Sequence, residues 1–292
     1  MFDHSFNRIA AAFAAAMIVS AFHPVKMNAG NPVMKGHDVW TVTSGVDHGG
    51  SDFSGLCFGP HGKRMLAIFN RPGLYWMDVP SSVDSPLVFS PILTVGHGLP
   101  CKRDMEGVAF HPRTSDIYFV QETETVFEGE RIYVPNSLYC LKAPDYTVEE
   151  RLYSFDEATV RPGNSGLEGL TRLRGRRFVI GVEGSRDGVK VKPALYFWSP
   201  RKGVYRHIDM SGKVRQVAEV CYDAQRKNLW IVDGDYDLRL YRCNMDGEIL
   251  SSYDISFIHN AEGICVDHKR DCIWIASDDK PSKLYKIYFE DL

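Results

Sequence analysis

The chain has 292 residues, of which 44% are hydrophobic and 24% are charged, as in an ordinary soluble protein that can bury a large core. Its formal net charge is −3, and no run rich in lysine and arginine is interleaved with aromatic residues. The composition therefore gives no reason to expect extensive disorder, and it argues against nucleic-acid binding.

The N-terminal residues 1–30 differ from the rest. Ile9–Phe22 is an unbroken apolar, alanine-rich run with the length of a signal-peptide core rather than of a membrane span. We therefore expect a signal peptide within residues 1–30, a mature domain that begins between residues 22 and 37, and a periplasmic or secreted protein. The alternative is an uncleaved segment that anchors the protein to the inner membrane. Lipid attachment is excluded because the first cysteine is Cys57.

A repeat runs through the rest of the chain. A short step with an acidic residue or serine, then glycine, then an aliphatic residue opens an apolar strand, and a second strand ends about fifteen residues later in a polar residue. The five openings are Ser54-Gly55-Leu56, Glu106-Gly107-Val108, Glu168-Gly169-Leu170, Ala218-Glu219-Val220 and Glu262-Gly263-Ile264. The matching second strands end at Asn70, Glu122, Glu183, Asp233 and Asp278. Self-similarity with a period of about fifty residues predicts a β-propeller.

The fourth repeat shows the plan of one blade. Its strands are predicted at Val220–Tyr222, Leu229–Val232, Leu238–Cys243 and Ile249–Ile255, with polar turns between them. Four antiparallel strands form one propeller blade. The first two strands carry the least charge, which is expected of inner strands that lie between neighbouring blades.

The other repeats fit this plan with insertions. Long loops are expected at Thr123–Ser137 in the second blade and at Gly184–Pro193 in the third. The fifth repeat ends after its third strand, Leu284–Phe289, and the strand-like segment Asp38–Thr43 is free to supply its fourth. We therefore predict an all-β fold, a single propeller domain over residues 37–292. It has five four-stranded blades closed by an N-terminal strand, with six blades as the alternative.

The seven cysteines do not form a recognisable disulfide framework. Their number is odd, their spacing is irregular, and no C-x-x-C pair suggests a thiolate metal site. Cys57, Cys221 and Cys265 each lie in the first strand of a repeat, where we expect them to be small buried hydrophobic residues.

The repeat openings also carry a family resemblance. The segments concerned are Asp52-Phe53-Ser54-Gly55-Leu56, Asp104-Met105-Glu106-Gly107-Val108, Asn164-Ser165-Gly166-Leu167-Glu168-Gly169-Leu170 and Ala261-Glu262-Gly263-Ile264. Their order resembles the SdiA-regulated (YjiK-like) family of exported bacterial β-propellers over nearly the whole chain after residue 37. The exported esterase-like domain similar to phytase shares the paired Glu-Gly steps. The resemblance implies a propeller with a calcium site in its channel and implies no settled activity.

Strand pairing predicts where the repeated acids lie. The start of a first strand and the end of a second strand lie side by side in an antiparallel pair. We therefore expect Glu106 beside Glu122, Glu168 beside Glu183, and Glu262 near Asp278. Because the first strands of a propeller line its central channel, these carboxylates converge at one mouth. There they repel one another unless they are protonated, paired with arginine or bound to a cation.

These acids predict one divalent cation at the channel mouth, and Ca²⁺ suits them because it accepts six to eight oxygen ligands. The expected ligands are Glu106, Glu168 and Glu262, supported by Glu122, Glu183, Asp233 and Asp278. Histidine is absent from these positions, which argues against zinc. In the fourth repeat Glu219 stands at the glycine position, so it is a weaker candidate. The alternative is that the acids cap backbone N–H groups and are neutralised by Arg71, Arg103 or Arg186, without a metal.

Catalytic motifs are scarce. The chain has no G-x-S-x-G elbow, no H-E-x-x-H and no glycine-rich phosphate loop. His259, three residues before Glu262, is the histidine best placed to act as a base beside a metal-bound water.

Two functions stay open on this basis. The first is a non-catalytic, calcium-binding exported propeller that recognises a small-molecule or protein ligand at the acidic mouth. The second is a metal-assisted hydrolase of a lactone, ester or phosphoester, as the likeness to phytase-type and gluconolactonase-type propellers suggests.

Overall fold

A computed structural model of the chain describes residues 37–43, 52–70, 73–94, 102–127, 130–133, 135–155, 166–184 and 191–292. The predicted signal peptide or anchor at residues 1–30 lies outside them. Their regular structure is β apart from two short 3₁₀ turns, η2 (Pro60–Gly62) and η3 (Phe289–Asp291). Over these ranges, no helix has both the length and the apolar character needed to cross a membrane.

The strands form five antiparallel sheets, each of which is one blade. The first blade contains β2 (Phe53–Phe58), β3 (Arg64–Phe69), β4 (Gly73–Asp78) and β5 (Phe89–Thr94). The second contains β6 (Lys102–Phe110), β7 (Ile117–Phe127), β8 (Glu130–Tyr133), β9 (Ser137–Leu141) and β10 (Glu149–Ser154). The third contains β11 (Leu167–Arg172), β12 (Phe178–Val182), β13 (Ala194–Ser199) and β14 (Gly203–Asp209). The fourth contains β15 (Glu219–Asp223), β16 (Asn228–Asp233), β17 (Arg239–Cys243) and β18 (Ile249–Asp254). The fifth contains β19 (Ala261–Asp267), β20 (Cys272–Ser277), β21 (Lys283–Tyr288) and β1 (His37–Thr41).

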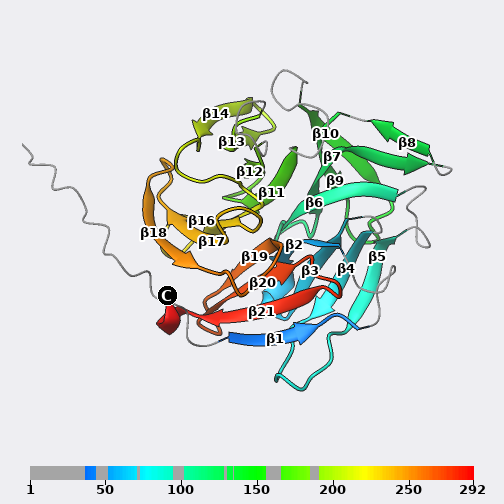
Figure 1. The fold of residues 1–292 in the computed structure, drawn as a ribbon. Helices are drawn as coiled ribbons and strands as arrows, with labels where there is room; N and C mark the ends of the chain where they lie inside the picture. The colour runs from blue at the N-terminus through cyan, green and yellow to red at the C-terminus, as the bar shows by residue number, and fades with distance from the viewer. Residues whose placement is uncertain are drawn as a thin grey trace, which may run out of the picture. The chain divides into compact units, whose positions relative to one another are not determined.

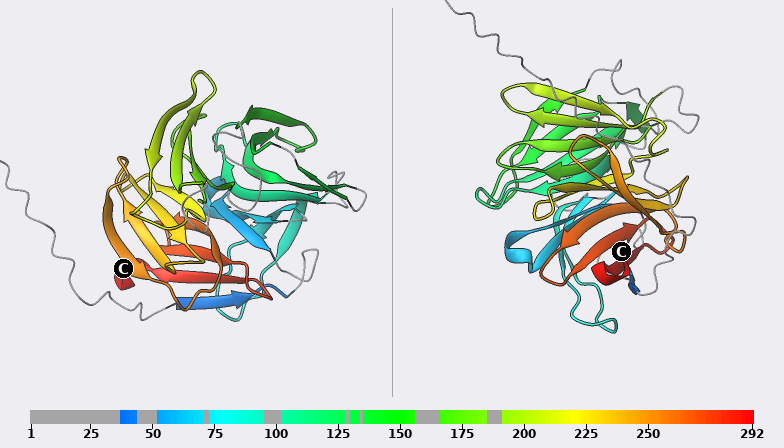
Figure 2. Two further views of the ribbon diagram at one scale, coloured as in Figure 1. Left: turned by 45° about the horizontal axis from the view of Figure 1, so that its top comes forward. Right: turned by 90° about the vertical axis from the view of Figure 1, so that its left-hand side faces the viewer.

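The blades are arranged in a ring around a central axis (Figures 1 and 2). The first strands contact one another in the order β2, β6, β11, β15, β19 and back to β2. The prediction of five blades is therefore confirmed, and the alternative of six is wrong.

The N-terminal strand closes the fifth blade, as predicted. β1 pairs antiparallel with β21, with His37 opposite Ile287 and Thr41 opposite Lys283. Trp40 of β1 is only 6% exposed, and its ring centroid lies 5.5 Å from that of Trp274. The first and last parts of the propeller are thus joined by hydrogen bonds and by a buried aromatic contact.

Five hydrophobic clusters hold the ring together, one between each pair of neighbouring blades. The second strands contribute most to them, because both of their faces are covered: every residue of β12 and β20 is buried. The outermost strand β10 faces solvent, and none of its residues is buried. This gradient matches the polarity gradient of the sequence.

One predicted loop is wrong. The segment Thr123–Ser137 was expected to be irregular, but β7 continues to Phe127 and pairs with the short strand β8. The alternating β-branched and aromatic residues of these segments favour extended pairing, so the insertion prolongs the sheet instead of leaving it. The other expected loop, Gly184–Pro193, lies mostly outside the described residues.

Candidate functional site

An acidic cavity of about 220 Å³ lies where the first strands begin, at one end of the channel. All five blades contribute to it. Its lining consists of Ser54, Asn70, Glu106, Glu122, Glu168, Glu183, Gln216, Asp235, Asn260, Glu262 and Asp278. Seven of these side chains are carboxylic acids, and none of the residues that the structure describes there is lysine, arginine, histidine or cysteine.

The structure brings six of the seven predicted acids to this cavity, Asp233 being the exception. Two groups are tightly packed. Ligand oxygens of Asp104, Glu106 and Glu122 lie within 4.8 Å of one another, and so do those of Glu122, Glu168 and Glu183. Glu122 belongs to both groups, so it links the second and third blades at the mouth.

Hydrogen bonds from neighbouring segments orient several of these acids. Glu122 accepts a hydrogen bond from the backbone N–H of Gly166. The Gln216 amide nitrogen donates to Glu183 Oε1 at 2.8 Å, and its Oε1 accepts from the N–H of Asp235 at 3.1 Å. Asp278 Oδ1 accepts from the N–H of Asp52 at 2.5 Å, which ties the fifth blade to the first.

The protonation of the acids reflects their crowding. Burial, followed by the nearby carboxylates of Asp104 and Glu183, raises the pKa of Glu122 to about 8, while the Gly166 N–H opposes these effects. Burial likewise raises the pKa of Glu183 to about 7 and that of Asp278 to about 6.

The three predicted main ligands are affected most. Burial, followed by the charges of neighbouring acids, raises the pKa values of Glu106, Glu168 and Glu262 well above the usual range of a glutamate. A cation in the cavity would offset this repulsion and favour the charged carboxylates.

Asp233 caps a loop instead of facing the cavity. Ile180, Ile231 and Ile275 occupy equivalent positions in their blades, because they pair with Leu170, Val220 and Ile264. Three residues further on come Glu183, Gly234 and Asp278. In the fourth blade, Gly234 therefore holds the position that Glu183 and Asp278 hold in theirs, and Asp233 comes one residue before it.

The one-residue offset turns the Asp233 side chain to other partners. The carboxylate is fully buried and accepts hydrogen bonds from the backbone N–H groups of Arg215, Gln216, Tyr236 and Asp237, at distances between 3.0 and 3.2 Å. This is the capping role that the sequence offered as an alternative to metal binding.

Glu219 occupies a different environment from the cavity acids. It stands where the other repeats have glycine, and its Oε1 accepts from the N–H groups of Leu170 at 2.7 Å and Val220 at 2.9 Å. A Cβ atom on Gly169 would lie only 2.8 Å from that oxygen, so glycine is needed there. Oε2 is buried and has no hydrogen-bond partner among the described atoms. Burial raises the pKa of Glu219 well above its usual value.

Sequence reasoning missed Asp104, Asp235 and Gln216. Asp104 lies two residues before Glu106, and strand alternation places both side chains on one face, so this signal was present. Asp235 and Gln216 come from the segments that flank the strands of the fourth blade, which has Ala218 and Gly234 at the equivalent strand positions. No local pattern marks these two residues.

The sequence also suggested His259 as a base at the mouth and three arginines that would neutralise the acids. His259 is exposed and does not line the cavity, although its carbonyl accepts a hydrogen bond from Ser277 Oγ at 2.8 Å. Arg71 and Arg186, proposed to neutralise the acids, lie outside the described residues, as does the side chain of Arg103.

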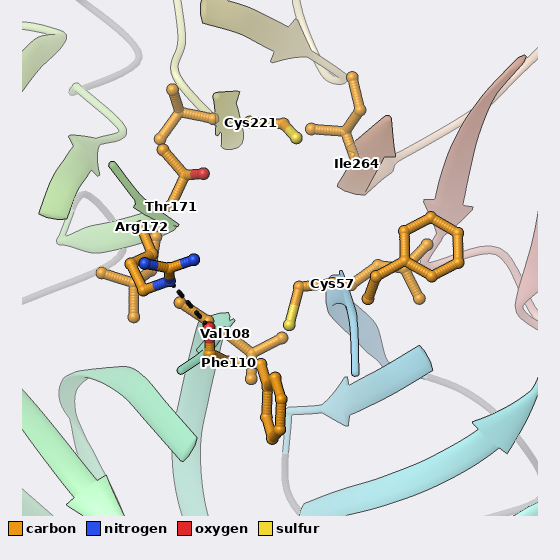
Figure 3. Close-up of a pocket in the computed structure, with 12 residues that line it drawn as sticks. Cys57, Val108, Phe110, Thr171, Arg172, Cys221 and Ile264 are labelled. Carbon is orange, nitrogen blue, oxygen red and sulfur yellow. Dashed lines mark hydrogen bonds between the residues drawn. The ribbon is translucent and has the colours of Figure 1, made fainter. Parts of the chain in front are cut away.

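The opposite end of the channel is largely apolar (Figure 3). Its cavity of about 140 Å³ is lined by side chains that include Cys57, Cys221, Val108 and Arg172. Cys57 and Cys221, expected to be small buried hydrophobic residues, pack against core clusters but are only partly buried, because first strands turn one face to the channel. Cys265 is 3% exposed in the core. All six cysteines in the described ranges are free thiols.

The donors at the acidic mouth suit a hard cation. Its lining offers carboxylate, amide and hydroxyl oxygens without thiolate or imidazole, which is the set that calcium accepts and zinc does not prefer. Comparison with protein-family models gave no match, and neither did comparison with curated proteins. The resemblance to the SdiA-regulated family therefore stays a prediction, and function must be argued from the site itself.

Proposed function

We propose that this propeller binds one divalent cation, Ca²⁺, at its acidic channel mouth and uses that site to recognise a small-molecule or protein ligand. The observation that carries the proposal is the gathering of seven carboxylic acids around one cavity with no described basic side chain in its lining. Glu106, Glu168 and Glu262 occupy equivalent positions in the first strands of three blades and would hold the ion. Glu122, Glu183, Asp278 and Asp235 would complete its surroundings.

The energetic reason is the mutual repulsion of buried acids. Without a cation, burial and the charges of neighbouring acids raise the pKa values of Glu106, Glu122, Glu168 and Glu262 and so disfavour their charged forms. A bound ion replaces several protons and cross-links the blades. If it binds only the folded chain, it stabilises the fold by about 2.7 kcal/mol at a hundredfold excess over the dissociation constant.

Calcium titration and thermal melting of chelator-treated protein test the proposal. We expect calcium to raise the melting temperature and to bind with one-to-one stoichiometry, and Glu168→Gln to weaken binding at least about tenfold, a loss of about 1.4 kcal/mol. Glu290→Gln is the matched control, because Glu290 is exposed near the C-terminus. If chelation removes the metal and leaves the wild-type melting temperature unchanged, loop capping should replace the cation site.

A metal-assisted hydrolase is the second candidate. The observation in its favour is the size of the cavity, since about 220 Å³ leaves room for water and a substrate group beside an ion. A catalytic metal site needs such an open position, whereas a structural site closes its shell. Calcium-dependent turnover of a lactone, an aryl ester or a phosphoester that is lost in Glu168→Gln would favour this candidate over simple binding.

Export belongs to the same proposal. The support is the apolar run Ile9–Phe22, and the extracellular or periplasmic space would also keep a site of modest calcium affinity filled. N-terminal sequencing of protein from its native host should find a start between residues 22 and 37. An intact Met1 on soluble cytoplasmic protein would rule export out.

A further inference from the structure

A basic cavity lies beside the channel, at the end opposite the acids. It has a volume of about 350 Å³ and is lined by His111, Pro112, Arg113, Arg172, Arg174 and Gly175. His111 follows β6, Arg172 ends β11, and Arg174 lies in the turn to β12. The cavity therefore sits between the second and third blades, where their first strands end.

Among the described residues, no acid pairs with the arginines of this cavity. None of Arg113, Arg172 and Arg174 lies within ion-pair distance of a carboxylate in the described parts of the chain, and no acid lines the cavity. The carboxylate that acts on His111 belongs to Asp116. Asp116 already accepts hydrogen bonds from Thr114 Oγ1 at 2.9 Å and from the N–H of Ala143 at 3.2 Å, and it lies 3.9 Å from Lys142 Nζ. Asp116 is therefore engaged by Thr114, Ala143 and Lys142, and it makes no ion pair with an arginine of the cavity among the described residues.

Two of the lining side chains are held in place. Arg172 Nε donates to the carbonyl of Phe110 at 3.1 Å, as Figure 3 shows, and this bond anchors the guanidinium between two blades. His111 is 7% exposed, and its Nδ1 accepts from the N–H of Thr114 at 3.2 Å. That bond leaves Nε2 to carry the ring proton, so the neutral imidazole is a donor.

We propose that this cavity binds a phosphate group, either free or as the monoester of a small molecule. Guanidinium groups match the oxygens of phosphate in a bidentate manner, and a donor imidazole adds to them. The volume is at the lower end of the range for small-molecule pockets, which favours a small ligand over a polymer.

The surroundings favour an anion as well. A neighbouring cavity of about 490 Å³ is lined by Arg176, Arg177, Arg201 and Lys202 together with Ser199, Pro200 and Tyr205. These two cavities are thus lined by basic residues, although the chain as a whole carries a net charge of −3. Such a field raises the local concentration of anions and their rate of association.

Calorimetric titration of metal-free protein with inorganic phosphate tests the proposal, with the chelator removed by dialysis and ionic strength held constant with sodium chloride. Without metal, phosphate cannot bind through a cation at the acidic mouth, so the result is independent of the calcium site. We expect saturable binding that falls at least about tenfold in Arg172→Gln and in Arg174→Gln, as loss of a charge-assisted pair implies. Arg174→Gln guards against misfolding, because Arg174 is exposed and its side chain makes no hydrogen bond in the described structure.

Arg201→Gln is the matched control, since it removes the same charge from the neighbouring cavity. We expect this substitution to leave phosphate affinity within about twofold, because Arg201 does not line the cavity of Arg172 and Arg174. Equal losses in all three variants would mean diffuse attraction and would overturn the proposal, as would absence of saturable binding. A parallel titration with glucose 6-phosphate identifies the source: tighter binding than phosphate indicates a monoester, and weaker binding indicates the free ion. Binding of an oligonucleotide that depends on Arg201 and Lys202 but not on Arg174 would contradict the small-ligand site.

Discussion

Asp233 and Asp235 lie two residues apart and face different surroundings. Asp233 accepts four backbone hydrogen bonds in a fully buried position, whereas Asp235 lines the acidic cavity. Within one turn of the chain, one residue therefore caps a loop and the other lines the cavity proposed to bind the cation.

We expect Asp233→Asn to destabilise the protein by about 2–4 kcal/mol, because the amide oxygen can accept from one pair of backbone N–H groups while the NH2 group, which is only a donor, faces the other pair. Its calcium affinity should stay close to that of wild type. Asp235→Asn should behave in the opposite way, with weaker calcium binding and little loss of stability. Urea unfolding and calorimetric titration measure the two effects. If the Asp233→Asn protein has normal stability but binds calcium more weakly, Asp233 is a calcium ligand, as the sequence predicted, and not a loop cap.

At the scale of elements, β1 decides whether the ring is closed. Its Trp40 packs against Trp274, and its indole N–H donates to the carbonyl of Ser82 at 2.9 Å. The strand therefore joins the fifth blade to the loop that connects β4 and β5 of the first blade. Its neighbour Val39 points outward and is 44% exposed.

We expect Trp40→Ala to lower the free energy of unfolding by about 3–5 kcal/mol, as for other buried large-to-small substitutions. Val39→Ala, on the same strand, should cost less than about 0.5 kcal/mol. Chemical denaturation measures both free-energy changes. Unfolding should be followed by far-UV circular dichroism instead of fluorescence, because one variant lacks a tryptophan. Equal and small effects would show that closure by β1 contributes little to stability.

At the scale of the molecule, the acidic mouth links stability to pH. Glu122, Glu183 and Asp278 have folded pKa values of about 8, 7 and 6, which lie above the usual values of these groups. The folded chain therefore binds these protons more tightly than the unfolded chain does. This contribution is complete near pH 4 and is lost as the pH rises through 6 to 8.

We therefore expect the metal-free protein to lose stability between pH 5 and pH 9, by an amount on the order of several kcal/mol. Saturating calcium should make the profile flatter, because the cation favours the ionised carboxylates. Urea midpoints measured across this interval, with calcium and with chelator, provide the comparison. Stability of the metal-free protein that increases with pH would contradict the assignment.

The sequence alone determined the repeat and the strand that closes the fifth blade, and it favoured five blades over six. It also predicted that seven acids converge on one mouth, and the structure places six of them there. These features follow from local rules. Strand alternation and antiparallel pairing place Glu106 beside Glu122 and Glu262 near Asp278 wherever the blade lies in space. Closure by β1 could be predicted because the fifth repeat visibly lacked a strand.

Only the tertiary structure decided what depends on register or on contacts between blades. Asp233 differs from Glu183 and Asp278 by one residue of register, and such an offset turns a side chain to the opposite face of the sheet. The basic cavity joins Arg113, Arg172 and Arg174 from two blades that meet only when the ring closes. Neighbouring blades are separated by about fifty residues of sequence, so no local pattern shows which side chains will face each other across their junction.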